Sequence, residues 1–219
     1  MMITKLTKEQ EDKMSEYADK WIEIGLSTDE CDREKAEHWC SEAYKAAGLE
    51  PPKQFIWANN PIECAELVDS LDDKGARVGN LVRYQIQREV MVKVSDCLKY
   101  RAWDQVWDEL RFQVDDKISP LVGRQVIWSQ LKERRDYHIW GKIMRQICGA
   151  HDAGWLCCND YMLNELSIKE CERIVPLMEL AKECGRWDPF ENVAILQEKP
   201  EKIRLKDGNE PNIFYRSVG

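Results

Sequence analysis

The chain has 219 residues, of which 43% are apolar and 33% are charged. This balance is typical of a globular protein with a sizeable core and excludes a disordered chain. The net charge of −8 argues against a nucleic-acid partner, because nucleic-acid binders present a basic surface to the phosphate backbone. No apolar stretch approaches the roughly 18 residues that a membrane span needs, so we expect no membrane contact.

Nine cysteines are spread along the chain without a CxxC pair, and the first residues lack the apolar segment of an export signal. These two features predict a cytoplasmic protein whose cysteines are reduced thiols, mostly in the core. No glycine-rich segment has the pattern of a phosphate-binding loop, and we expect no cofactor.

Helical patterns begin near the amino terminus. Thr7 with Gln10 forms a capping box that predicts the start of a first helix, and Gly25 ends it. Asp32 offers a cap for a second helix, which Gly48 terminates. The two helices should form an antiparallel pair.

The next segment contains a short strand. Apolar residues at 55–57 lie between turn formers, and Asn60 followed by Pro61 predicts a third helix. Helical spacing then dominates up to residue 185. Within this region we expect Asp152 to cap one helix, and Ser167 to open another that Pro176 kinks or splits.

After Pro189 the pattern changes to short alternating segments, at 192–197, 202–205 and 213–216. The sequence therefore predicts a mostly α protein with a small β-sheet, an α+β fold. We expect a single domain over 1–219, with a helical body at 7–185 and a carboxyl-terminal β-hairpin region at 192–216. The strand near Ile56 should pair with these terminal strands, because an isolated hairpin is only marginally stable.

Two motifs in the last third combine glycine, tryptophan and ionisable side chains. The first, at 149–155, contains His151, Asp152 and Trp155. The second, at 184–193, contains Arg186, Trp187, Asp188, Glu191 and Asn192. Packing alone does not require this combination, since glycine permits close backbone approach and each indole brings a donor that needs a partner.

Both motifs, together with the segment from Gly25 to Pro51, resemble in order the conserved segments of a bacterial family catalogued as a domain of unknown function. Some members of that family occur alongside leucine-rich repeats. The resemblance implies one compact domain and no activity, since none is assigned to the family. The chain departs from the family pattern where Arg186 and Asp188 flank a single Trp187, in place of an aromatic cluster.

The preferred interpretation is a binding or interaction protein with an aromatic-lined site formed by the two motifs. Its partner would be an unidentified protein or a small ligand. The candidate ligand-binding residues are Trp155, Arg186, Trp187, Asp188 and Asn192. The glycines would let the motifs approach each other, and the two indoles would wall the cleft.

The alternative is an enzyme, such as a hydrolase. His151, oriented by Asp152 or Glu191, has the residue types of a general base. Adjacent residues of a helix do not face each other, however, so we favour a structural role for His151 and a capping role for Asp152.

Cysteine chemistry offers two further hypotheses. A zinc ion would need Cys148, His151 and Cys158 on one helical face, which the neighbouring glycines argue against, so we predict no metal site. A catalytic thiol at Cys157 or Cys158 would lie too far from a helix amino terminus to be activated, so we expect both in the core.

Overall fold

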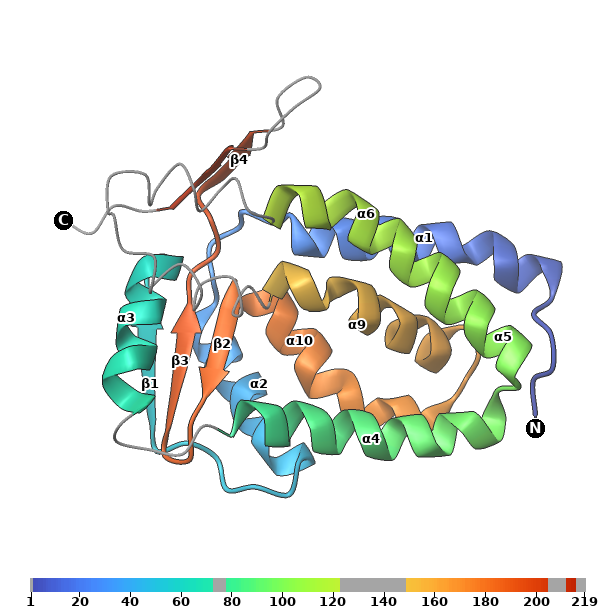
Figure 1. The fold of residues 1–219 in the computed structure, drawn as a ribbon, viewed down its shortest axis with the longest axis horizontal. Coiled ribbons are helices and arrows are strands. Elements are labelled where there is room, and N and C mark those ends of the chain that lie inside the picture. Colours follow the sequence, from blue (N-terminus) through green and yellow to red (C-terminus); the bar gives the residue numbers. More distant parts are fainter. Residues whose placement is uncertain (1, 73–77, 123–148, 205–211, 216–219) are drawn as a thin grey trace.

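A computed structural model describes residues 2–72, 78–122, 149–204 and 212–215 of the protein. Helices form most of it, and a small three-stranded sheet lies at one end (Figure 1). The predicted fold class, mostly α with a small β-sheet, is confirmed. In the described part of the chain, none of the helices is both long and apolar enough to cross a lipid bilayer.

The first two helices, α1 (Lys8–Gly25) and α2 (Arg33–Ala46), begin where the sequence predicts. The Thr7 hydroxyl accepts a bond from the Gln10 backbone N–H, and the Gln10 side chain accepts one from the Thr7 N–H. The Asp32 carboxylate caps α2 by accepting a bond from the Lys35 backbone N–H. Side-chain acceptors satisfy N–H groups that the first helical turn leaves without partners.

The third helix begins after Asn60, whose side-chain oxygen accepts bonds from two backbone N–H groups in the first turn. Helical structure continues through a π-helical turn to residue 122. In chain order the elements are α3 (Pro61–Asp72), α4 (Gly79–Cys97), α5 (Tyr100–Asp104), η1 (Gln105–Leu110) and α6 (Arg111–Val122).

The later helices are α9 (Gly149–Asn164), the 3₁₀ helix η2 (Lys169–Ile174) and α10 (Val175–Glu183). Pro176 splits the predicted helix, because a proline is tolerated in the first turn of α10 but not in a helix interior. The capping box predicted at Ser167 is wrong. Ser167 has a positive φ of 56°, and η2 begins after Ile168 without a side-chain cap.

The main sheet has the strand order β1 (Gln54–Ala58), β3 (Val193–Gln197) and β2 (Arg186–Pro189). Strand β1 runs parallel to β3, and β2 is antiparallel to it. The predicted pairing of the strand near Ile56 with a terminal strand is confirmed. A separate two-stranded pair joins β4 (Lys202–Arg204) and β5 (Asn212–Phe214).

Strand β2 lies in a segment that was not predicted to form a strand. Its charged residues Arg186 and Asp188 occupy alternate positions and therefore lie on the same face of the sheet. They pair with each other there, which allows a strand with two charges to be buried.

The sheet is covered on both faces. Helix α3 packs on one face through a small apolar cluster that includes Cys64, Val68 and Ile195. The helical body covers the other, where Trp187 and Leu196 join the main core and Trp187 stacks edge-on against Tyr44. We call these the α3 face and the body face.

Helix α9 is the centre of the helical body, with α1 and α6 along one side and α10 along another (Figure 1). Every residue from Asp152 to Met162 is buried. A helix that is apolar almost all round packs in this way, because it has no face to turn towards water.

Gly185 and Gly48 provide a test of the packing. A Cβ at Gly185 would lie 2.7 Å from the Glu198 carbonyl oxygen, a backbone atom that cannot move aside alone. We expect Gly185→Ala to lower the free energy of unfolding by about 2–3 kcal/mol. Gly48 has a φ of +73° and open space around it, so Gly48→Ala should cost only about 1 kcal/mol of strain. Urea unfolding of both variants checks the order, and equal costs would contradict it.

Candidate functional site

Polar side chains gather where β1 and β3 end, because parallel strands bring their carboxyl ends to the same edge of a sheet. Gln197 is the last residue of β3, and Glu198 follows it with its backbone N–H bonded to the Ala58 carbonyl at the end of β1. Side chains alternate between the two faces of a strand. This edge therefore carries one polar cluster on each face of the sheet.

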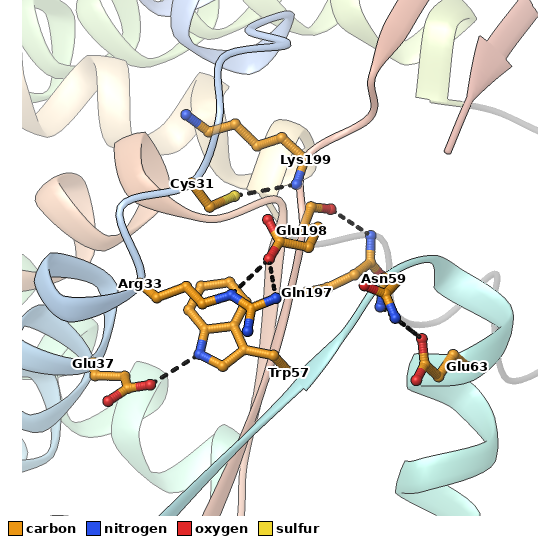
Figure 2. Close-up of polar contacts among 9 residues, drawn as sticks. All are labelled: Cys31, Arg33, Glu37, Trp57, Asn59, Glu63, Gln197, Glu198 and Lys199. Atoms are coloured by element: carbon orange, nitrogen blue, oxygen red, sulfur yellow. Dashed lines mark hydrogen bonds and ion pairs between the residues drawn. The ribbon is translucent and has the colours of Figure 1, made fainter. Parts of the chain in front are cut away.

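The body-face cluster is built around Glu198, a buried carboxylate (Figure 2). Arg33, at the start of α2, places its Nη2 2.7 Å from the Glu198 Oε1 and its guanidinium over the Trp57 ring. The Trp57 indole N–H donates to the Glu37 carboxylate at 2.9 Å. Arg33 balances the charge of Glu198, and the contacts of Arg33 and Glu37 attach α2 to the sheet edge.

Cys31 and Lys199 extend this cluster. The Lys199 backbone N–H donates to the Cys31 sulfur, and the Lys199 ammonium donates to the Lys182 carbonyl. Burial raises the pKa of the Cys31 thiol to about 11. The thiol is therefore protonated at neutral pH, which is the opposite of what a nucleophilic cysteine requires.

The α3-face cluster contains Arg186 and Asp188. The Arg186 Nη2 donates to the Asp188 Oδ2, and the Cys64 thiol of α3 lies 3.6 Å from the same oxygen. Only 3% of the Arg186 side chain is exposed to solvent. This guanidinium is therefore cut off from bulk water and depends on neighbouring groups for its hydrogen bonds.

Those neighbours leave part of the Arg186 side chain unbonded. In the described structure the buried Nε and Nη1 atoms have no hydrogen-bond partner, and neither has the Oε1 atom of Gln197. Arg186 and Gln197 are direct cross-strand partners in the β2–β3 pairing. Unbonded donors and an unbonded acceptor thus occur side by side on one face of the sheet.

Tyr215 borders this cluster from the segment after β5. Its hydroxyl hydrogen-bonds the Gln197 side chain, and Arg186 lies close enough to act on its charge. Burial raises the pKa of the Tyr215 phenol to about 12, so its hydroxyl remains a neutral donor at physiological pH.

The 149–155 motif lies in the first half of α9, and Asp152 is inside that helix instead of capping it. The Asp152 Oδ1 accepts the Trp155 indole N–H at 2.9 Å and lies 2.7 Å from the Arg83 Nη2. Arg83 also stacks over the Trp155 ring. Asp152 is thus bound to the indole and to α4. The His151 side chain lies outside what the structure describes.

The two predicted motifs have separate surroundings. Trp155 interacts with Asp152 and Arg83, whereas Trp187 packs on the body face beside Tyr44. Among the described residues, the two indoles share no hydrogen-bonding or ring-stacking partner. The aromatic-lined cleft between the motifs therefore stays a prediction.

Glu191 and Asn192 form the exposed turn between β2 and β3. This turn lies at the end of the sheet opposite to the start of β2, away from the first residues of α9 (Figure 1). The Asn192 carbonyl accepts backbone bonds from Lys53 and Gln54, so its described role is to hold the chain entering β1. The structure does not bring Glu191 to the 149–155 motif.

Gly154 of the first motif allows two helices to pack closely. A Cβ at Gly154 would lie 2.3 Å from the Asp115 Oδ1 of α6, so its absence allows α6 and α9 to approach each other. The tight contact between these two helices explains the position of this glycine without a ligand.

The described cysteines, eight in number, are free thiols. Cys157 and Cys158 are fully buried, as expected for core residues, and the Cys158 thiol donates to the Val106 carbonyl at 3.5 Å. Cys148, part of the weighed zinc set, lies outside the described residues. Within the described ranges, no three histidine, cysteine or acidic side chains are grouped to hold a metal ion.

Reasoning from the sequence identified Arg186 and Asp188 but missed Gln197, Glu198 and Arg33. The available signal was the polar pair at 197–198, directly after the apolar run of β3. Polar residues that follow a buried strand are placed at the sheet edge, where connecting loops meet.

Comparison with known proteins adds no assignment: no protein-family profile, curated protein or solved structure matches this chain. The resemblance to the bacterial family stays an expectation from the motifs.

The role of Asp152 can be tested by substitution. Asp152→Ala removes the acceptor of a buried indole N–H, so we expect the free energy of unfolding to fall by about 1–3 kcal/mol. Asp152→Asn retains an acceptor and should recover part of the loss. Asp96→Ala, at an exposed position of α4, is the control and should stay within about 0.5 kcal/mol. If Asp152→Ala had the same free energy of unfolding as the wild type, a structural role for Asp152 would be contradicted.

The raised pKa of Cys31 predicts a dependence of stability on pH. The unfolded thiol ionises near pH 9 and the folded thiol near 11, so unfolding releases a proton between these values and becomes easier as the pH rises. Relative to Cys31→Ala, the wild type should lose roughly 2 kcal/mol of unfolding free energy between pH 8 and 10.5. Chemical denaturation of both proteins across this range measures the difference. A constant difference would show that the thiol is not shielded.

Proposed function

We propose that the protein is a non-catalytic binding protein whose ligand site is the α3-face cluster around Arg186. The observation that carries the proposal is the buried guanidinium whose Nε and Nη1 atoms have no partner among the described residues. A small ligand with a carboxylate or phosphate oxygen would supply an acceptor that this site lacks.

Buried donors of this kind are costly to leave unbonded. Withholding a hydrogen bond from a buried polar group costs about 1–3 kcal/mol, and more when the group is charged. Native proteins keep few such groups, and those that remain mark bound water, bound ions or functional sites. Arg186 has two atoms of this kind, in a side chain that is almost entirely enclosed.

The shape of the guanidinium explains why Asp188 does not satisfy it. A guanidinium has two edges at which paired N–H bonds point in the same direction, one formed by Nε and Nη2 and the other by Nη1 and Nη2. The Nη2 atom, which contacts Asp188, belongs to both edges. A single carboxylate cannot accept from Nε and Nη1 together, because their N–H bonds point in different directions. A second acceptor group is therefore needed beside Asp188.

Of the ligand-binding residues predicted from the sequence, this site retains Arg186 and Asp188. Trp187 lies on the opposite face of the sheet, so an α3-face ligand would not contact its ring. An enzymatic alternative gains no comparable support, since Asp152 is engaged by Trp155 and Arg83 while Glu191 lies in an exposed turn.

The proposal is tested by NMR of the arginine side chains. We expect the Arg186 Nε–H signal to shift and saturate when ¹⁵N-labelled protein is titrated with sodium acetate, and again with inorganic phosphate, at constant ionic strength. Arg173, whose Nε already donates to the Ala46 carbonyl at 3.1 Å, is an internal control and should move little. An unchanged Arg186 signal with both anions would mean that only water occupies the site, and would overturn the proposal.

A variant pair gives a second readout. We expect acetate to raise the melting temperature of the wild-type protein. Arg186→Lys keeps the positive charge beside Asp188 but loses the Nε and Nη1 donors, so this rise should disappear in the variant. Arg33→Lys is the matched control on the body face, where the guanidinium is paired with Glu198. Equal stabilisation of both variants would show that acetate acts elsewhere.

A further inference from the structure

The unbonded atoms on the α3 face include both donors and an acceptor. A ligand that bonds all of them must carry a hydrogen-bond donor as well as an anionic oxygen. Arg186 offers N–H donors, whereas the Gln197 Oε1 is an acceptor. The two residues are direct cross-strand partners, and side chains at such positions are near enough to contact one molecule together. A group between them must accept from Arg186 and donate to Gln197.

The Gln197 amide is held from its nitrogen side. Its Nε2 lies 3.4 Å from the Glu198 carbonyl, and its side chain also hydrogen-bonds the Tyr215 hydroxyl (the Glu198 contact is drawn in Figure 2). These contacts fix the orientation of the amide and leave the Oε1 as a buried acceptor. Rotating the amide to donate to the ligand would break them.

Charge narrows the choice between carboxylate and phosphate. Asp188 already provides one negative charge at the Arg186 guanidinium. A monoanion adds one more, whereas a phosphate dianion would add two beside the same carboxylate. In a buried setting like charges repel strongly, so the cluster favours the smaller charge.

We infer, resting on the proposed function, that the ligand is a small monocarboxylate with a hydroxyl on the adjacent carbon, a 2-hydroxy acid. The carboxylate accepts from Arg186, and the neighbouring O–H donates to the Gln197 Oε1.

The test compares three probes by the shift of the Arg186 Nε–H signal in the wild-type protein. Glycolate has the adjacent hydroxyl, acetate lacks it, and methoxyacetate keeps the oxygen but cannot donate. We expect glycolate to bind about 5-fold more tightly than either of the others, the effect of one hydrogen bond. Inorganic phosphate should bind more weakly than glycolate.

A variant locates the donor contact. Gln197→Met keeps the length of the side chain but removes the acceptor, so the ratio of the glycolate affinity to the acetate affinity, both measured on the variant, should fall from about 5 to about 1. Equal binding of glycolate and acetate to the wild type would overturn this inference and leave the proposed function standing. Tighter binding of phosphate would overturn the charge argument, and no shift with any probe would overturn both proposals.

Discussion

The burial of α9 on all sides is the constraint on which the rest of the structure depends. Every residue from Asp152 to Met162 is buried, so the carboxylates in this stretch need partners that offset their desolvation. Asp160 accepts from the Trp21 indole and pairs with Lys20 of α1, and Asp152 pairs with Arg83 of α4. These bonds tie the central helix to two of its neighbours, so the helical body cannot rearrange without exposing a buried carboxylate.

The sheet continues this body and differs on its two faces. On the body face Arg33 pairs with Glu198 and the Trp57 indole N–H donates to Glu37, so α2 is joined to the strands by bonded groups. On the α3 face the pairing is incomplete, because Arg186 has more donors than Asp188 can accept. Two clusters built from similar residue types thus differ in the hydrogen-bonding atoms that they leave unbonded, and the ligand site that we propose is the incomplete one.

The candidate site could be predicted only in part. Arg186 and Asp188 were predicted as site residues because they are charged and flank a tryptophan. The same prediction put Trp187 in one cleft with them. Pairing of β2 with β3 puts Trp187 on the opposite face, since alternate residues of a strand point in opposite directions. Gln197 was missed because its importance depends on its cross-strand neighbour, which is distant from its own local pattern.

The sequence by itself determined the helix starts at Thr7, Asp32 and Asn60, the stop at Gly48 and the mostly helical class with a small sheet. Caps and periodicity act between residues a few positions apart, so they can be recognised without the fold. Tertiary structure decided that Asp152 binds an indole inside a buried helix, that a charged segment becomes strand β2, and that Arg186 meets Gln197. These outcomes depend on desolvation and on partners far along the chain, and both exist only after the chain has folded.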